Sequence, residues 1–148
     1  GAPDKLHQQQ RDEAGKARRE ATANDTEAKG MGVLVEAMMP KLVSPRAPDD
    51  VRRRIEAMIR SVDPKGAAAA TRGMAQRADS KDILARFAGP ALVVVGRQDV
   101  ITPPEKAKEL AGLMGGARLV EIDGAGHLAN LEKPEAFNAA LGEFLALG

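Results

Sequence analysis

The sequence predicts an α/β fold in which a helical segment precedes a β-α-β-α unit with parallel strands. Two observations support this prediction. Between residues 31 and 88, apolar side chains recur every three or four positions, which is typical of amphipathic helices. After Gly89 and Pro90, continuous apolar runs alternate with a helical pattern, which is typical of a parallel sheet covered on both faces. From the length of 148 residues we expect one domain, or one domain with a helical appendage.

The composition argues against several classes of protein. The net charge is +1, from 22 basic and 21 acidic residues, whereas a nucleic-acid binder concentrates positive charge on one face. The only dense basic run, Arg52 to Arg54, lies beside acidic residues and is predicted to be a solvated helix face. There is no cysteine, which excludes disulfides and thiolate nucleophiles and suits a cytoplasmic protein. No apolar run approaches the roughly 20 residues that span a bilayer, and residues 1–30 are too polar for a signal peptide.

Residues 1–88 are predicted to be helical throughout. Residues 1–30 are expected to form a polar arm, exposed or frayed, because helix formers dominate but the apolar stripe is thin. Residues 31–88 are expected to form a cap-like segment of four short helices. Their predicted apolar faces are Met31, Leu34, Val35, Met38 and Met39; Val51, Ile55, Met58 and Ile59; Ala67, Ala70 and Met74; and Ile83, Leu84 and Phe87. Pro40 is expected to stop the first helix, and a loop follows at 44–48. Asp49 or Asp50 can cap the second helix, Asp63-Pro64 opens the third with proline in its first turn, and Ser80 caps the fourth.

Residues 89–148 are predicted to form the β-α-β-α unit. The first strand is expected at 91–95, ending at Gly96, and the second at 117–122. The helix between them is expected to start at Thr102-Pro103-Pro104, with Thr102 as its cap and proline at its first position, and the last helix is expected to begin at Pro134. The last helix presents Phe137, Ala140, Leu141, Phe144 and Leu145 on one face. Because strand-helix-strand connections are right-handed crossovers, the two strands should be parallel.

Two polar residues follow the predicted strands at the point where each strand ends. Asp99 closes the stretch Gly-Arg-Gln-Asp after the first strand, and His127 follows the turn Gly-Ala-Gly after the second. Adjacent parallel strands place both loops at one edge of a sheet, where ligands of α/β proteins bind, so the two side chains should come within hydrogen-bond reach. A carboxylate beside a histidine fixes the ring tautomer, as a general base requires. Taken singly, Asp99 is more simply a solvated or capping residue and His127 an exposed loop histidine.

Four stretches carry a resemblance to a known family: 92–99, 102–104, 124–128 and 130–137. Together they closely resemble the last segment of α/β-hydrolases of the small esterase and 3-oxoadipate enol-lactonase type. The resemblance implies a partial α/β-hydrolase fold, with Asp99 as the acid of the catalytic triad and His127 as its histidine. It also implies that the helices of 31–88 correspond to the cap domain that roofs the substrate pocket.

The sequence departs from that family at the nucleophile. The family's Gly-x-Ser-x-Gly elbow precedes the cap, and it is absent here, as are the oxyanion-hole loop and the central strands. None of the three serines, Ser44, Ser61 and Ser80, lies between a strand and a helix with flanking glycines. Asp99 as a carboxylate nucleophile has no local support, and His7 is not expected to be catalytic. We therefore expect a C-terminal fragment of a serine-type hydrolase, beginning just after the strand that precedes the cap and inactive alone.

Two exposed strand edges are avoided in natural proteins, so something should complete the sheet. The candidates are the missing N-terminal half and a second copy of this chain, which would make a homo-oligomer. The alternative function is a non-catalytic oligomeric scaffold derived from a truncated hydrolase. A third hypothesis is a small-molecule binder with a pocket lined by Met31, Met38 and Met58, although methionines in such stripes usually fill a core.

No metal, cofactor, nucleic acid or membrane is expected as a partner. The two histidines, His7 and His127, lie far apart in the sequence and give no metal-ligand spacing. The glycines at 124 and 126 are followed by a histidine rather than by the helix start of a phosphate-binding loop.

Overall fold

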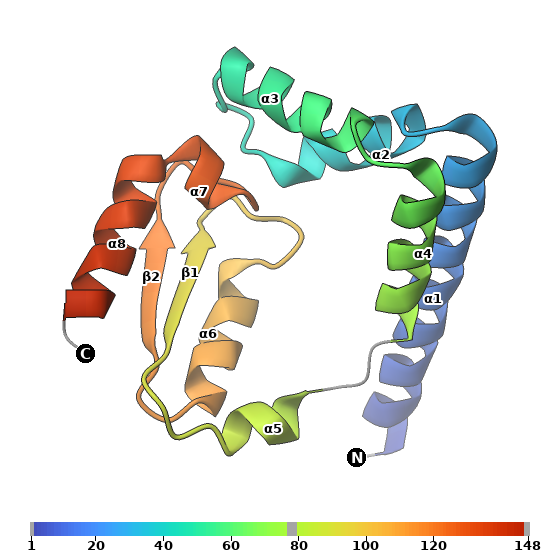
Figure 1. The fold of residues 1–148 in the computed structure, drawn as a ribbon. Helices are drawn as coiled ribbons and strands as arrows, with labels where there is room; N and C mark the ends of the chain where they lie inside the picture. The colour runs from blue at the N-terminus through green and yellow to red at the C-terminus, as the bar shows by residue number, and fades with distance from the viewer. Residues whose placement is uncertain (1, 77–79, 147–148) are drawn as a thin grey trace. The chain divides into compact units, whose positions relative to one another are not determined.

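The computed structural model describes residues 2–76 and 80–146 of the chain. Along the chain, five helices (α1–α5) are followed by β1, α6, β2, α7 and α8 (Figure 1). The chain divides into two compact units, one within residues 1–37 and 56–78 and the other within residues 38–55 and 79–148. The division falls inside α2 and α3. None of the described helices is long and apolar enough to cross a membrane.

The first unit is built on two helices, α1 (Ala2–Lys29) and α4 (Pro64–Ala75), which run side by side in opposite directions (Figure 1). Ala23 and Thr26 of α1 and Ala68 of α4 are almost completely buried. The predicted helix at the N-terminus is confirmed, but α4 covers one side of its second half. The predicted start of α4 at Asp63-Pro64 is also confirmed, and the Asp63 side chain caps the helix by accepting a hydrogen bond from Gly66 N at 2.9 Å.

The apolar face predicted for α4 is wrong. Ala68 is buried, whereas Ala70 and Met74 are exposed. Arg72 lies one turn after Ala68, on the same side of the helix. Its guanidinium group donates hydrogen bonds to Glu20, Asn24 and Glu27 of α1. This polar cluster turns the side that carries Ala68 and Arg72 toward α1.

We expect Arg72→Met to destabilise the first unit in a pH-dependent manner. The hydrogen bond from Arg72 lowers the pKa of Glu27 below its ordinary value of 4.5. A carboxyl group with a lowered pKa stabilises the folded state above its ordinary pKa, and this stabilisation is lost as the pH falls through the lowered value. In thermal unfolding followed by circular dichroism, Arg72→Met should reduce Tm at pH 7, and the reduction should shrink toward pH 3. Arg53→Met is the control, because Arg53 is exposed, and a constant reduction across the pH range would contradict the assignment.

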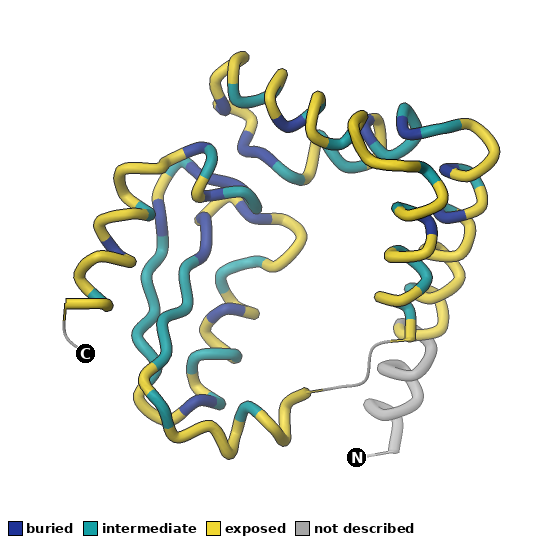
Figure 2. The backbone as a smooth tube through the Cα atoms, in the orientation of Figure 1, coloured by how far each residue is buried: buried dark blue, intermediate teal, exposed yellow. Residues whose placement is uncertain are grey.

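The second unit contains the sheet. Strands β1 (Leu92–Gly96) and β2 (Arg118–Ile122) pair in parallel, in a register that aligns Leu92 with Arg118. Helix α6 (Pro104–Leu113) connects them, and α6 and α8 (Pro134–Ala146) flank the strand pair on opposite sides (Figure 1). The predicted β-α-β-α unit with parallel strands is thus confirmed. The carboxyl ends of both strands are the buried ends (Figure 2), and Ile122, Ala125 and Ala129 form a core cluster there with Val94, Val120 and Phe137 packed against it.

The remaining helices are α2 (Gly32–Leu42), α3 (Asp49–Arg60), α5 (Lys81–Ala85) and α7 (Ala129–Glu132). The four helices predicted between 31 and 87 are all present as α2–α5. The prediction that Pro40 stops α2 is wrong, since the helix continues for two residues beyond it. A proline inside a helix removes one backbone hydrogen bond, and so short a continuation tolerates this loss. Asp49 belongs to the first turn of α3 rather than capping it. The sequence pattern does not predict α7, which is only one turn long.

Several residues predicted to lie on buried helix faces are exposed: Met58, Met74, Ile83, Phe87, Leu141 and Leu145. Apolar periodicity identifies the face of a helix that could be buried, but it does not supply the partner that buries it. The predicted exposed basic run is correct for Arg53 and Arg54 only. Arg52 instead donates hydrogen bonds to the carbonyl oxygens of Ser44, Pro45 and Ala47 and so holds the loop between α2 and α3.

Candidate active site

The loops that follow β1 and β2 are tied together by their backbones. Arg97 N donates to Ile122 O, and Gln98 N donates to Ala125 O, both at 2.9 Å. A Cβ atom at Gly96 would collide with the carbonyl oxygens of Ala125 and Gly126. Only glycine allows this approach, so the two loops lie directly against each other at the edge of the sheet.

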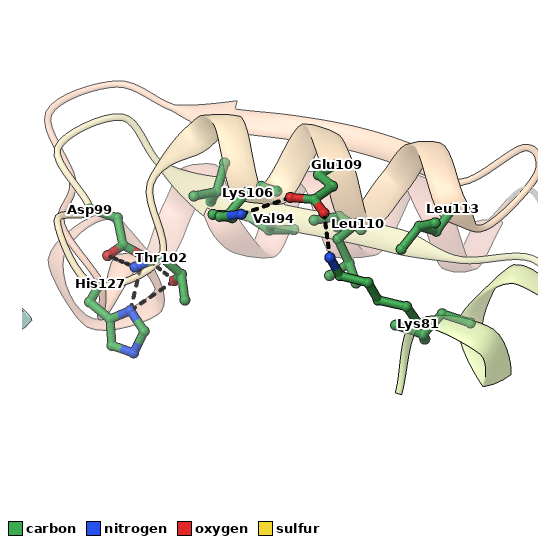
Figure 3. Close-up of a pocket in the computed structure, with 13 residues that line it drawn as sticks. Lys81, Val94, Asp99, Thr102, Lys106, Glu109, Leu110, Leu113 and His127 are labelled. Atoms are coloured by element: carbon green, nitrogen blue, oxygen red, sulfur yellow. Dashed lines mark hydrogen bonds and ion pairs between the residues drawn. The ribbon is translucent and has the colours of Figure 1, made fainter. Parts of the chain in front are cut away.

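Asp99 and His127 meet at this junction, as Figure 3 shows. Asp99 Oδ2 lies 2.9 Å from His127 Nδ1. The side chain of Asp99 is 4% exposed and that of His127 is 32% exposed. The structure therefore brings the two predicted residues within hydrogen-bond reach, and Asp99 is not the solvated turn residue that its local sequence favours.

Asp99 accepts hydrogen bonds from four groups. Ile101 N and Thr102 N donate to Oδ1 at 2.8 and 2.9 Å, and Thr102 Oγ1 and His127 Nδ1 lie 2.7 and 2.9 Å from Oδ2. Burial tends to raise the pKa of Asp99, but the hydrogen bonds outweigh burial and hold this pKa below its ordinary value of 3.8. Asp99 is therefore a carboxylate at neutral pH, which can only accept hydrogen bonds. It follows that Nδ1 of His127 carries a proton, so that in the neutral ring Nε2 is the acceptor.

Thr102 has a role that the sequence does not predict. It does not cap α6, whose N-cap is Pro103 without a side-chain hydrogen bond. Its hydroxyl group instead donates to Asp99 Oδ2 and lies 3.3 Å from His127 Nδ1. The signal in the sequence is the spacing, because an aspartate side chain commonly binds backbone N–H groups two or three residues ahead. Thr102 thus holds Asp99 through both its backbone and its hydroxyl group.

An open hollow of about 430 Å³ lies along β1 and α6, with Asp99 and His127 at one end (Figure 3). Val93, Val94 and Val95 all line it. Successive side chains of a strand point to opposite faces, so three consecutive lining residues show that the backbone edge of β1 borders the hollow. Among the described residues, that edge has no strand partner.

Charged side chains also line the hollow, between Asp99 and Leu113 (Figure 3). Glu109 of α6 lies 2.9 Å from the ammonium groups of both Lys81 and Lys106. Hydrogen bonds from Lys106 and Lys81 lower the pKa of Glu109 to about 2. Both lysines that line the hollow thus form ion pairs with this carboxylate.

The other candidate residues do not line the hollow. Met31, Met38 and Met58 are not among its lining residues, and the side chain of His7 lies outside the described residues. Ser44, Ser61 and Ser80 lie in or beside connections between helices. Within residues 2–76 and 80–146, no cluster of three or more acidic or histidine side chains is arranged to hold a metal ion.

Comparison with known proteins places this geometry in a family. Residues 63–148, more than half of the chain, match the α/β-hydrolase family described as TAP-like protein. The structure is similar to an esterase from Thermogutta terrifontis, with 38% identity, a TM-score of 0.86, and coverage of 90% of this chain and 50% of that one. It is also similar to the enol-lactonase of Burkholderia xenovorans, with 31% identity, a TM-score of 0.73, and coverage of 85% and 49%.

A curated relative gives the same result at the level of sequence. A pimeloyl-(acyl-carrier protein) methyl ester esterase of Neisseria meningitidis is 38% identical over 74 residues, which cover 50% of this chain and 29% of that protein. The chain thus spans about half the length of the solved structures it matches and less than a third of this curated relative. The strand-helix order and the match over more than half of its residues lead to one conclusion: the chain belongs to the α/β-hydrolases, in the family described as TAP-like protein.

Proposed function

We propose that this chain supplies the acid and the histidine of a serine-type hydrolase that cleaves esters or lactones, and that residues outside this sequence supply the nucleophile. The observation that carries the proposal is the contact between Asp99 Oδ2 and His127 Nδ1, which joins a buried but ionised carboxylate to a partly exposed ring. The esterase and enol-lactonase among the similar proteins support the substrate class. The proposal assigns no role to a metal or an organic cofactor.

The proposed mechanism follows from the protonation of the pair. Nε2 of His127 takes the proton of a serine hydroxyl while the serine oxygen bonds to the carbonyl carbon of the substrate. Asp99 remains ionised, keeps the ring in the correct tautomer and stabilises the imidazolium that forms. The imidazolium then returns the proton to the leaving oxygen as the bond between that oxygen and the carbonyl carbon breaks. Water, which gives a proton to the same Nε2, then attacks the acyl-serine, and the imidazolium returns this proton to the serine oxygen as the acid is released. Thr102 holds the Asp99 oxygens in place during these transfers.

The proposed partner is the nucleophile-bearing half of the hydrolase. No strand of the described part of the chain pairs with the edge of β1 beside the hollow, and such an edge is a template for another strand. Because the solved relatives are about twice as long as this chain, we propose that a strand of that half pairs with β1. Native mass spectrometry separates this proposal from self-association, because the latter would give homo-oligomers of this chain alone.

The helical part would serve as the cap. In this proposal residues 31–88 roof the substrate pocket and residues 89–148 form the C-terminal segment of the catalytic domain. Because α1 packs along α4, we place the polar helix of residues 1–30 with the cap.

The test is a gain of activity. This chain would be fused behind the half of the Thermogutta terrifontis esterase that it does not cover, and hydrolysis of p-nitrophenyl butyrate would be measured. We expect turnover from the fusion and none from this chain or that half alone. A folded fusion without turnover would favour the alternative, a non-catalytic scaffold derived from a hydrolase.

A further inference from the structure

Glu132 is a buried carboxylate that the proposed chemistry does not use. It is the last residue of α7 and is 6% exposed. Burying a carboxylate is unfavourable unless hydrogen-bond donors replace the lost water. The donors that surround Glu132 therefore indicate what its burial accomplishes.

Both of its donors are backbone N–H groups. Ser44 N lies 3.0 Å from Oε1 and 3.0 Å from Oε2, and Gly126 N lies 2.8 Å from Oε1. Ser44 belongs to the loop between α2 and α3, and Gly126 directly precedes His127. A single carboxylate thus joins the histidine loop to Ser44, which is 88 positions from Glu132 in the sequence.

The same segment holds the other side of His127. Leu128 N donates to Leu42 O at 3.0 Å. The two backbones also lie very close, because a Cβ atom at Gly126 would be 2.7 Å from both Ser44 N and the carbonyl carbon of Val43. His127 is therefore flanked on both sides by residues that are fixed against 42–44.

We propose that Glu132 is a positioning residue for His127, and that through it the loop between α2 and α3 sets the geometry of the Asp99–His127 pair. Asp99 orients the ring from its own loop, whereas Glu132 fixes the backbone from which the ring projects. Because a general base must be held closely to its productive geometry, the inference deepens the proposed function and rests on it. It also gives the cap-like segment a second role besides covering a pocket.

The loop that Glu132 anchors is itself held in place. Arg52 donates from α3 to the carbonyl oxygens of Ser44, Pro45 and Ala47. The Ser44 hydroxyl is buried and has no hydrogen-bond partner among the described residues. We call the hydrogen bonds from Ser44 N and Gly126 N to the Glu132 carboxylate the clamp. Ser44 contributes its backbone N–H to the clamp but not its side chain, so a substitution of this side chain is a matched control for Glu132.

The test uses nuclear magnetic resonance on the full chain. In Glu132→Gln, the side chain offers one oxygen in place of two, and its NH2 group faces the N–H of Ser44. We expect hydrogen exchange of the Gly126 and Ser44 amides to accelerate at least tenfold, and the ¹⁵N signals of His127 to change from one tautomer to an average of both. Ser44→Ala keeps the backbone donor and should leave both readouts unchanged. His7→Gln assigns the imidazole signals, since the chain has only two histidines.

The outcomes separate this inference from the proposed function. An unchanged His127 tautomer in Glu132→Gln, or exchange that accelerates equally throughout residues 80–146, would mean that Glu132 only stabilises the fold and would overturn the inference. If wild-type His127 carries its proton on Nε2, the proposed function fails, whereas amide exchange still reports on the clamp. If Glu132→Gln does not fold, the wild type provides the test. Scalar couplings should then be measured across the hydrogen bonds from Gly126 N and Ser44 N to the Glu132 carboxyl carbon. Their absence would overturn the proposal.

Discussion

Replacement of Asp99 by Asn in the active fusion is expected to reduce kcat about ten-thousand-fold, with little change in KM. The Asn side chain carries no charge, so it neither favours the proton on Nδ1 nor stabilises the imidazolium. It also replaces one oxygen with an NH2 group, which cannot accept a hydrogen bond. This NH2 group would face either the N–H groups of Ile101 and Thr102 or the donors at Oδ2. The Michaelis parameters for p-nitrophenyl butyrate check this expectation.

The matched control is Asp123→Asn. Asp123 follows β2 as Asp99 follows β1, but its side chain is 80% exposed and its ionic contact, with Arg97, is 3.7 Å long. This variant should retain kcat within about twofold, as expected for an exposed residue outside the pair. Equal loss from both variants would mean that general disruption of the loops, rather than the lost carboxylate, reduces the rate.

The largest effect on stability is expected from Gly96→Ala. The added methyl group would collide with the carbonyl oxygens of Ala125 and Gly126, and both are backbone atoms that cannot rotate away. The loops after β1 and β2 would have to separate, with loss of the hydrogen bonds from Arg97 N and Gln98 N. We expect the free energy of unfolding to fall by about 3 kcal/mol, at the upper end of overpacking costs. Urea denaturation of the isolated chain measures it.

Gly142→Ala serves as the control for this substitution. Gly142 lies inside α8, and a Cβ atom there would meet nothing within 4 Å. Alanine is favoured over glycine in a helix, so this variant should gain about 0.5–1 kcal/mol. A small effect of Gly96→Ala, similar in size to that of Gly142→Ala, would show that the loops are not tightly joined.

The sequence predicts the strands, their direction and the approach of Asp99 to His127, because these depend on local patterns. Continuous apolar runs identify parallel strands, and the carboxyl ends of such strands meet at one edge. The side of α4 that is buried could not be predicted in the same way. It depends on the cluster of Arg72 with Glu20 and Glu27 of α1, which joins residues distant in the sequence.

The roles of Thr102 and Glu132 could not be predicted from the sequence for a related reason. Thr102 before two prolines has the pattern of a helix cap, and only the folded loop shows that its hydroxyl group binds Asp99. Glu132 lies in a short helix, where a charged residue is ordinarily assigned to the surface. Its hydrogen-bond partners are the backbone N–H groups of Ser44 and Gly126, and residue types do not reveal which backbone groups a side chain binds.

The role of His127 as the general base of a hydrolase can be tested by measuring kcat of the fusion that carries His127→Ala. His7→Gln removes the only other histidine and serves as the control. We expect a loss of kcat of at least ten-thousand-fold for His127→Ala and wild-type turnover for His7→Gln. Retention of turnover by a folded His127→Ala fusion would contradict this role.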